Sequence, residues 1–347
     1  MMMTGRLSGN VVLVEDPREA NKIYNRGYFG KPQSGGGLEL DLTEALLLLE
    51  GCKLKVADSG CELSFDALLG IADSAFLDFE IKYLAYRDLR SRGYVVRMAE
   101  DGFDFDVYAR GDAPHTGGPA HKALAFSERS PLKISDIANH ALRLKEGQSL
   151  VLAIVDEESD ITYYENVKEE LSGTFAPSLP GNVCATLLKD RVLVADEGAV
   201  LALHRATYGQ KVGDRLMLSL VETADLMKRG LLEVVKDGAA MGQDEFENYA
   251  ELIQSDLRNR LKVYGDLRST GLIVKTGFKF GTHFRVYRKS MEKEHAPFLI
   301  HAMPNDGDTT WPEVSRGIRL AHSVKKNMVF ALVGEKMTYF ALGRMRP

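Results

Sequence analysis

The sequence predicts an α/β protein (α+β, with mixed sheets) built from two tandem homologous units. Three observations lead to this prediction. The Tyr-x-Asp-Leu-Arg pattern around Asp88 recurs 178 residues later around Asp266. The strand-like run 152–155 recurs at 330–333 with the same offset, which indicates an internal repeat. Stretches of helical period alternate with short β-branched and aromatic stretches in both units.

Each unit begins with a small subdomain of helices and strands, which we place at 1–83 and 184–260. Leucine-rich or amphipathic stretches near glycines predict two helices in each subdomain. These predicted helices are 39–50 and 64–71 in the first unit, and 216–229 and 243–250 in the second.

Each unit ends with a second α/β subdomain, which we place at 84–165 and 261–347, with a linker at 166–183 that contains proline and glycine. The first is predicted to contain helices 76–92 and 134–146 and strands 94–98, 103–109, 122–127, 149–155 and 161–165. The second is predicted to contain helices 254–270 and 312–325 and strands 272–276, 279–288, 297–303, 327–333 and 337–342. The last strand of each unit is a candidate for edge pairing.

Composition places the chain among soluble globular proteins, because 45% of the residues are hydrophobic and 27% are charged. No apolar run approaches the ~20 residues of a membrane span, and no signal-peptide core follows the N-terminus. We therefore expect a cytoplasmic protein without membrane contact. Cys52, Cys61 and Cys184 lack metal-ligand spacing, and we expect them to be reduced and buried.

Charge is distributed unevenly between the two units. Residues 261–347 hold 15 Lys and Arg against 7 Asp and Glu, although the whole chain has a net charge of −5. Residues 84–165 hold 10 Lys and Arg against 14 Asp and Glu. A basic domain in an acidic chain is typical of a phosphate-binding face, and chance clustering of surface charge is the alternative.

Three side chains of the basic subdomain are candidates for catalysis. Tyr287 ends the run Gly-Thr-His-Phe-Arg-Val-Tyr, and His295 and Lys326 follow it. RNA cleavage without a metal needs a base for the 2′-OH, an acid for the leaving 5′-oxygen and a cation for the phosphate. A phenol is a weak base at neutral pH, but adjacent positive charge favours its ionised form. The structural alternatives are a packed strand tyrosine, a loop histidine and a cation at a helix C-terminus.

Other residues compete for two of these roles. His283, His301 and His322 are rivals of His295, and Lys325 is a rival of Lys326. We expect His322 to serve packing or helix capping. Trp311 is expected in the core.

The first unit keeps the hydrophobic pattern of the second but not its charges. Lys326 corresponds to Gln148, and the histidine spacing is met only loosely by His115 or His121. Acidic residues stand where the second unit has basic ones; they are Glu100, Asp101, Asp104 and Asp106. We therefore predict a first unit that is non-catalytic and retained for structure.

The run 274–287, His295 and the Arg-x-Ala-His-Ser-Val-x-Lys segment 319–326 together resemble the archaeal tRNA-splicing endonuclease (tRNA-intron lyase) family. The resemblance is specific over 262–347 and weaker, through the repeat, over 20–165. The tandem arrangement is similar to the homodimeric form of that family, in which a degenerate unit precedes a catalytic one. It implies cleavage of precursor tRNA at bulge-helix-bulge junctions, leaving 2′,3′-cyclic phosphate and 5′-OH ends, with no metal and no cofactor.

The same resemblance implies roles for particular residues. Tyr287 would be the base, His295 the acid and Lys326 the group that stabilises charge on the phosphorane. Two arginines from opposite subunits would sandwich a bulge base, and Arg319 and Arg344 fit this pair, with Arg346 a rival of Arg344. Because Arg319 precedes Lys326 by seven residues, we expect both on one side of a helix.

In that family an acidic loop of the non-catalytic unit docks in a basic cleft of the opposing catalytic unit. The corresponding residues here are Asp156, Glu157, Glu158 and Asp160, between two predicted strands. A solvated turn is the alternative.

Two other functions are compatible with parts of the sequence. The chain could be a non-catalytic RNA-binding or assembly subunit, but the intact Tyr287, His295 and Lys326 argue against it. A metal-dependent nuclease needs clustered carboxylates with a Glu-x-Lys or Asp-x-Lys element on a strand, and Glu292-Lys293-Glu294 lacks that spacing.

Overall fold

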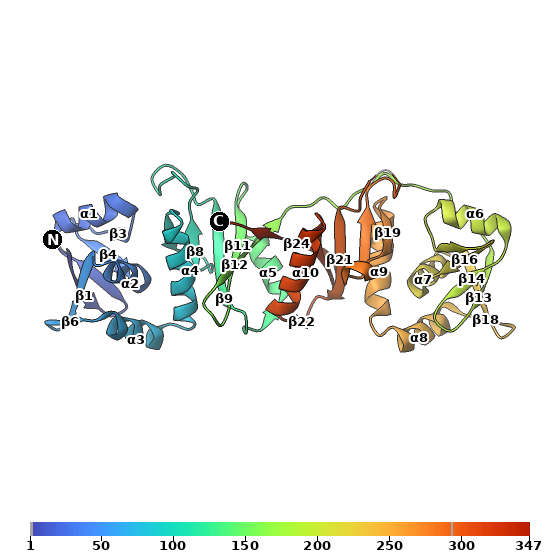
Figure 1. Cartoon of the computed structure of the whole chain (residues 1–347), viewed down its shortest axis with the longest axis horizontal. Helices are drawn as coiled ribbons and strands as arrows, with labels where there is room; N and C mark the ends of the chain where they lie inside the picture. Colours follow the sequence, from blue (N-terminus) through green and yellow to red (C-terminus); the bar gives the residue numbers. More distant parts are fainter. Residues whose placement is uncertain (1–2, 293) are drawn as a thin grey trace.

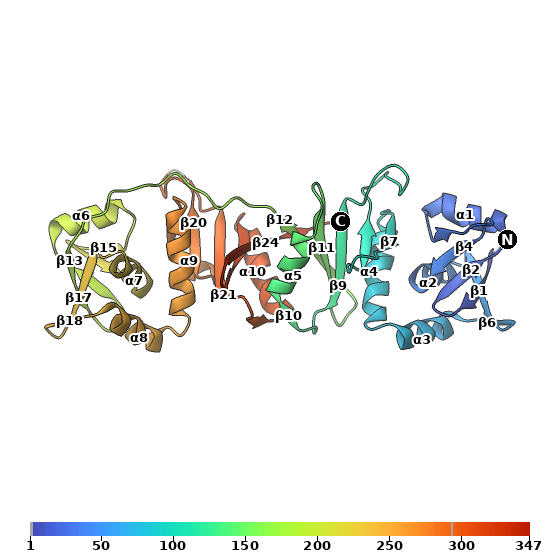
Figure 2. The same cartoon turned by 180° about the vertical axis from the view of Figure 1, so that it is seen from behind.

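The computed structural model describes residues 3–292 and 294–347 and shows an elongated molecule. The N-terminal subdomain of the first unit lies at one end and that of the second unit at the other, with the two C-terminal subdomains between them (Figures 1 and 2). None of the helices within the described ranges is long and apolar enough to cross a membrane.

A single ten-stranded mixed sheet runs through both C-terminal subdomains. Its order is β19-β20-β21-β23-β24-β12-β11-β9-β8-β7. The second unit contributes β19 (Ile273–Thr276), β20 (Phe284–Tyr287), β21 (Phe298–Pro304), β23 (Asn327–Val333) and β24 (Met337–Met345). The first unit contributes β7 (Val96–Met98), β8 (Phe105–Val107), β9 (His121–Ser127), β11 (Ser149–Val155) and β12 (Ile161–Val167). The two candidate edge strands, now β12 and β24, pair antiparallel with each other, so neither is a free edge.

Helices cover both faces of this sheet. On one face lie α4 (Phe79–Ser91) and α9 (Leu257–Ser269), and on the other lie α5 (Ile134–Leu142) and α10 (Trp311–Ser323). The core under α5 and α10 contains residues of both units. Trp311 belongs to this core, 1% exposed and 5.1 Å from the ring of Phe126, which confirms its predicted burial. A small sheet of β10 (Leu132–Lys133) and β22 (Asp308–Thr309) also joins the units.

Each N-terminal subdomain has a six-stranded sheet and three helices. The first contains β1 (Met3–Ser8), β2 (Val11–Val14), α1 (Pro17–Gly27), β3 (Lys31–Pro32), β4 (Leu38–Asp41), α2 (Leu42–Glu50), β5 (Leu54–Asp58), β6 (Cys61–Leu63) and α3 (Phe65–Ala75). The second contains β13 (Val183–Leu187), β14 (Val192–Val194), α6 (Glu197–Arg205), β15 (Gln210–Val212), β16 (Arg215–Leu218), α7 (Leu220–Lys228), β17 (Leu232–Lys236), β18 (Ala239–Met241) and α8 (Gln243–Ile253).

The helices predicted at 39–50 and 216–229 are too long at their starts. The run Leu38–Asp41 is strand β4, and Asp41 then caps α2 in a capping box with Glu44. In the second unit Ser219 caps α7 in the same way. The apolar pattern continues through the strand into the helix, so periodicity alone does not mark the boundary. Helices α1 and α6 were not predicted.

The expected burial of the cysteines is wrong, because all three side chains are exposed. Cys184, for example, lies on the outward side of β13, where exposed and buried residues alternate.

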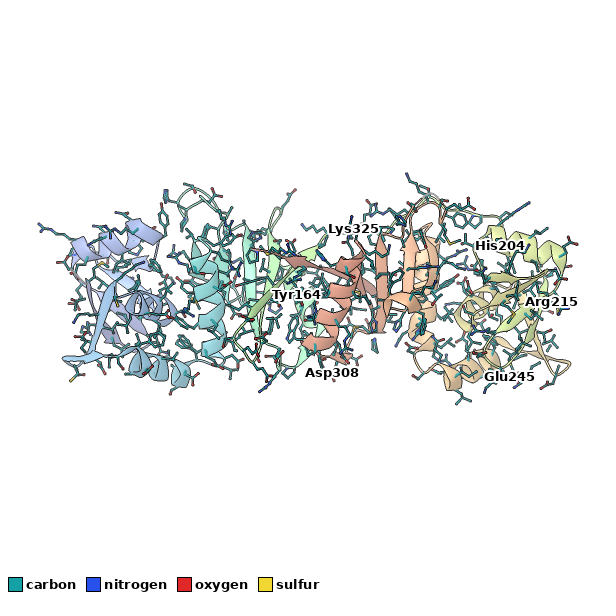
Figure 3. The ribbon with its side chains drawn as sticks, in the orientation of Figure 1. Tyr164, His204, Arg215, Glu245, Asp308 and Lys325 are labelled. Carbon is teal, nitrogen blue, oxygen red and sulfur yellow. The ribbon has the colours of Figure 1, made fainter. Side chains whose placement is uncertain are left out.

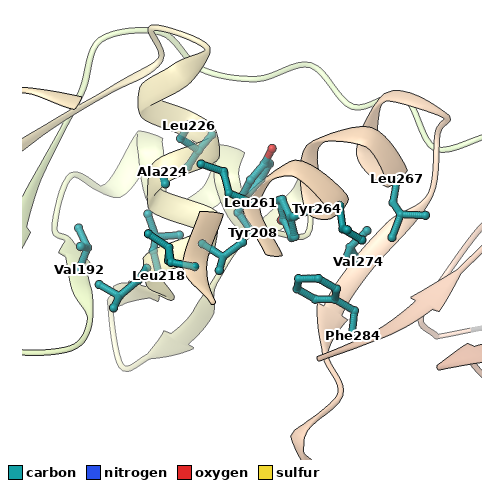
Figure 4. Packing of buried hydrophobic residues seen from close by; sticks show 14 of the residues in the cluster. Val192, Tyr208, Leu218, Ala224, Leu226, Leu261, Tyr264, Leu267, Val274 and Phe284 are labelled. Carbon is teal, nitrogen blue, oxygen red and sulfur yellow. The ribbon is translucent and has the colours of Figure 1, made fainter. Parts of the chain in front are cut away.

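One continuous core connects the N-terminal subdomain of the second unit to its C-terminal subdomain. Figure 4 shows Tyr208, Tyr264 and Phe284 packed between the two parts. The hydroxyl of Tyr208 donates a 2.8 Å hydrogen bond to Asp225 within this core. The buried contact holds strand β20, which ends in Tyr287, against the rest of the unit.

Candidate active site

Strand β20 places Tyr287 on the α10 face of the sheet. Phe284 and Val286 point into the core beneath α9, so the alternating residues Arg285 and Tyr287 point the opposite way. Tyr287 is 8% exposed and packs in a small cluster with Ile273 and Ala296.

Lys326 lies beyond the end of α10. The helix ends at Ser323, and Lys325 adopts a left-handed conformation with φ 55°. The backbone N–H of Lys326 then donates to the carbonyl of Ala321 over 2.9 Å. Because the chain has already left the helix, the seven-residue spacing from Arg319 does not place both side chains on one helical face, and that expectation is wrong. Figure 3 shows Lys325 at this end of α10 and Asp308 at the other.

Two of the candidate catalytic residues contact Ala296, and the third, His295, directly precedes it in the chain. Lys326 Nζ donates a 2.6 Å hydrogen bond to the carbonyl of Ala296. The side chain of Ala296 packs in the Tyr287 cluster, and the exposed His295 directly precedes it in the chain. Tyr287 and Lys326, from two separate segments, therefore lie against the residue that follows His295. Such a set can supply a base, an acid and a fixed cation.

Positive charge gathers beside this cluster. Burial and the nearby charge of Arg285 lower the pKa of Lys326, and its Nζ lies 5.7 Å from the ring centroid of Phe280. The Nε of Arg285 is buried and makes no hydrogen bond. Within the described ranges, no carboxylate forms an ion pair with Arg285 or Lys326. Two unpaired cations of this kind can hold phosphate oxygens. Arg285 was missed as a site residue, although its alternation with Tyr287 is visible in the sequence.

His283 and His301 have structural surroundings. His283 Nδ1 accepts a 3.0 Å hydrogen bond from the N–H of Ala302, and its Nε2 lies 3.3 Å from Asp256. The two histidine rings stack with centroids 4.2 Å apart. Burial, the charge of His301 and that of Arg260 lower the pKa of His283 to about 3. Both rings are engaged in packing, and His283 is neutral near pH 7, which makes it a poor proton donor.

The remaining rival, His322, is exposed in the last turn of α10.

The two candidate bulge-binding arginines lie on different elements. Arg319 is exposed on α10. Arg344 is exposed on β24, opposite Tyr164 of the first unit, so it lies at the junction between the units (Figure 3 shows Tyr164). Arg346 is also exposed, beyond the end of β24.

The acidic segment forms the turn between β11 and β12. Asp156 Oδ1 accepts hydrogen bonds from the backbone N–H groups of Glu158, at 3.0 Å, and Asp160, at 2.9 Å. Asp156 therefore shapes the turn. Glu157 forms an ion pair with Arg129. Among the residues with described positions, Glu158 and Asp160 have no ion-pair partner, and both are exposed.

Two family models match the chain, each in two places. The model of the tRNA intron endonuclease catalytic C-terminal domain matches 79–163 and 257–339. The model of the tRNA intron endonuclease N-terminal domain matches 3–69 and 183–247. Each unit is thus matched once by the same pair of domains, in the same order.

Proteins named tRNA-splicing endonuclease are similar over nearly the whole chain. One from Methanococcoides burtonii is 40% identical over 346 residues, which cover 96% of this chain and 97% of that protein. One from Methanosarcina mazei is 39% identical over 355 residues, with 99% of each covered. One from Natronomonas pharaonis is 35% identical over 364 residues, which cover 99% of this chain and 100% of that protein. The chain belongs to the tRNA intron endonuclease family.

Proposed function

We propose that the chain is a tRNA-splicing endonuclease that cleaves precursor tRNA at bulge-helix-bulge intron junctions, without a metal ion or other cofactor, in the cytoplasm. The observation that carries the proposal is the contact of both Tyr287 and Lys326 with Ala296, the residue that follows His295. The family model that matches this part of the chain is that of a catalytic domain. The relatives named above carry the same activity in their names.

In the proposed reaction, Tyr287 accepts the proton of the 2′-OH next to the scissile phosphate. The 2′-oxygen forms a bond to phosphorus while the bond from phosphorus to the 5′-oxygen breaks. His295 donates a proton to that leaving oxygen, and the Lys326 ammonium stabilises the additional negative charge on the phosphoryl oxygens. The products are a 2′,3′-cyclic phosphate and a 5′-OH, and the nucleophile comes from the substrate itself.

We propose further that two chains form a homodimer and that the acidic turn of one enters a basic cleft of the other. A cavity of about 390 Å³ between α9, β19 and the second N-terminal subdomain supports this proposal. Its cationic lining residues are Arg191, Arg260, Lys275 and Arg285. The exposed carboxylates of Glu158 and Asp160 have the complementary charge.

In such a dimer, Arg319 and Arg344 from opposite subunits would hold a bulge base between their guanidinium planes, a contact that tolerates different bases. We also propose that the chain is divided into the subdomains 1–83, 84–165, 184–260 and 261–347, with residues 166–183 as the linker between the two units.

The proposed reaction is tested by cleavage of a bulge-helix-bulge RNA in EDTA, with identification of the product ends. Wild type is expected to leave cyclic phosphate ends, and His295→Ala is expected to lose most of the cleavage. The matched control His322→Ala should cleave like wild type. Full activity of His295→Ala would assign the acid elsewhere, and no cleavage by folded wild-type protein would leave an RNA-binding or assembly subunit.

The proposed dimer is tested by sedimentation of the double variant Glu158→Gln/Asp160→Asn. The variant keeps the size of both side chains and removes two charges, so it should shift the equilibrium toward monomer. The control Asp73→Asn/Glu80→Gln changes two exposed carboxylates elsewhere in the first unit and should sediment like wild type. Unchanged association of the first variant would contradict docking through this turn.

A further inference from the structure

The linker between the units does not run freely through solvent. Its segment 169–175, which we call the strap, crosses the outer end of β19 and β20; the linker continues along one side of the second unit toward α6 (Figures 1 and 2). Three backbone hydrogen bonds attach it: Gly173 N–H to Thr270 O at 3.0 Å, Thr174 N–H to Arg288 O at 3.1 Å, and Phe175 N–H to Gly271 O at 2.9 Å.

The strap approaches the catalytic subdomain closely enough to require glycine on both sides. A Cβ atom on Gly173 would lie 2.2 Å from the carbonyl oxygen of Gly271. A Cβ atom on Gly271 would lie 2.6 Å from the carbonyl oxygen of Gly173, and Gly271 also has a φ of +78°. Glycine, which has no Cβ atom, allows the two backbones to come this close at both positions.

Glu169 of the strap contacts the residues that directly follow two of the proposed catalytic residues. One carboxylate oxygen lies 3.3 Å from Nη2 of Arg288, the residue after Tyr287. The other accepts a hydrogen bond from the side-chain amide of Asn327, the residue after Lys326. Strands β20 and β23 are not neighbours, because β21 lies between them. One carboxylate thus connects the two strands across the intervening one.

Phe175 completes the contact from the other end of the strap. Its partly buried ring packs against the cluster of Ile273, Tyr287 and Ala296. The guanidinium carbon of Arg268 lies 5.8 Å from the centre of the same ring. The aromatic side chain covers the cluster that holds Tyr287 and the residue whose carbonyl binds Lys326.

The first unit lacks the side chains that bind Glu169. Tyr108 and Gln148 occupy the positions of Tyr287 and Lys326, and they are followed by Ala109 and Ser149. Alanine has no side-chain donor, and the shorter Ser149 side chain lies 2.7 Å from Nδ1 of His121. Arg288 and Asn327 are therefore particular to the unit that carries the candidate catalytic residues.

We propose that Glu169 and Phe175 are positioning residues for RNA cleavage: the strap fixes the relative placement of Tyr287 and Lys326. The inference rests on the proposed roles of these two residues. According to this proposal, the linker connects the two units and also holds the proposed catalytic residues in place. A small displacement of reacting groups is costly in rate, because a misplacement of about 1 Å can cost ~100-fold.

The first test compares Glu169→Ala with wild type in single-turnover cleavage under saturating enzyme, and in binding of a 2′-deoxy substrate that cannot be cleaved. The cleavage rate constant should fall by about tenfold or more, whereas the Kd should change by less than about twofold. Glu169→Gln keeps the acceptor for Asn327 and should recover part of the rate. The control Glu170→Ala removes a neighbouring carboxylate that accepts a hydrogen bond from Ser172, keeps the backbone carbonyl that accepts from Arg288, and should behave like wild type. Equal loss in rate and binding, or no loss, would overturn the proposal.

A second measurement does not depend on activity. Amide hydrogen exchange at 287–288 and 326–327 should increase in Glu169→Ala and in Phe175→Leu, but not in Glu170→Ala, if the strap holds these segments. Unchanged exchange would contradict the proposal even if cleavage fell.

The double variant Glu169→Ala/Lys326→Ala separates this proposal from the proposed function. It should cleave no more slowly than Lys326→Ala alone, because the strap acts through the residues it positions. A wild-type rate in Lys326→Ala would instead refute the catalytic role of Lys326, while the exchange data would still decide whether the strap orders the site.

Discussion

In the second unit the ammonium of Lys326 donates a 2.6 Å hydrogen bond to the carbonyl of Ala296, and in the first unit the amide of Gln148 donates a 3.0 Å hydrogen bond to the carbonyl of Pro119. The two bonds occupy the same place. Lys326 directly precedes β23, and Gln148 directly precedes the equivalent strand β11. Ala296 lies two residues before β21, which pairs with β23, and Pro119 lies two residues before β9, which pairs with β11. The hydrogen bond is present in both units, but only the donor of the second unit is charged.

A charged position on the neighbouring strand is also basic in the second unit and acidic in the first. Arg285 and Asp106 occupy equivalent positions, opposite Lys275 and Arg97 in their strand pairs. In the first unit, Lys122 forms 2.6 Å ion pairs with both Asp106 and Asp101. In the first unit, the cation at this place is thus paired with carboxylates of the same unit.

In the second unit the position of Lys122 is taken by Leu299, which lies opposite Arg285. Arg285 and Lys326 therefore have no carboxylate partner among the described residues. The comparison indicates that the shared backbone places equivalent groups in both units, whereas the neighbouring residues decide whether their charges are paired within the chain.

The largest expected effect comes from giving the second unit the first unit's residue. Lys326→Gln can keep the hydrogen bond to Ala296, as Gln148 does with Pro119, but it removes the charge that would stabilise the phosphorane. Single-turnover cleavage should fall by about 10²–10³-fold, with an unchanged melting temperature. Lys325→Gln is the control and should cleave nearly normally. A rate within threefold of wild type would show that charge at this position is not what separates the units.

The next effect concerns the stability of the first unit. Lys122→Met keeps the aliphatic stem and leaves the carboxylates of Asp101 and Asp106 without their partner. Because the Lys122 side chain is only 10% exposed, we expect the free energy of unfolding to fall by about 2 kcal/mol in urea titration. Lys133→Met, at a more exposed position, should change it by less than about 0.5 kcal/mol. Equal effects would contradict the idea that the first unit depends on this ion pair.

Removing a cation from the second unit, at Arg285, should affect binding and leave stability nearly intact. Arg285→Met removes a cation without an ion-pair partner, so we expect weaker RNA binding and a slope of log K against log salt that is smaller by about 1. Titration with a 2′-deoxy substrate at several salt concentrations measures both. Arg205→Met, on α6, serves as the control. An unchanged slope would mean that Arg285 does not contact phosphate.

The last comparison concerns a difference in acid sensitivity. His283 and Asp104 occupy equivalent places and accept from the N–H groups of Ala302 and Ala125. Burial lowers the pKa of His283 from 6.5 to about 3, so the unfolded chain takes up the proton first. The resulting stability is present above about pH 6.5 and is lost as the pH falls toward 3.

His283→Asn keeps an acceptor and cannot be protonated, so its melting temperature should fall less steeply between pH 6.5 and 4 than that of wild type. His322→Asn, at an exposed position, should keep the wild-type slope. Parallel slopes for His283→Asn and wild type would show that His283 is not protonated on unfolding in this range.

Elements with a strong internal signal were predicted well. The helix now called α9 was expected at 254–270 and spans Leu257–Ser269, because a clear apolar face and a terminal glycine mark it. The mixed-sheet architecture and the duplication were also predicted correctly, and both family models match twice. The start of α2 was misplaced because Leu38–Asp41 and the following helix share one apolar run.

Contacts between distant segments could not be predicted in the same way. Nothing near Glu169 in the sequence indicates that its carboxylate reaches Arg288 and Asn327, more than 110 residues away. The last strands of the two units were expected to be candidates for edge pairing, but the sequence did not indicate that β12 and β24 pair with each other. Such contacts depend on where whole elements pack, and local periodicity carries no information about that.

The sequence by itself determined the two-unit organisation, the family and the unequal charges of the units, because repeats, motifs and composition are properties of the chain order. The tertiary structure alone decided that Tyr287 and Lys326 meet at Ala296, that the charge of Arg285 acts on Lys326, and that the strap connects the ends of their strands. The physical reason is that these contacts join segments far apart in the chain. Sheet order and helix packing set the distance between such segments in space, and the spacing of residues along the sequence does not specify it.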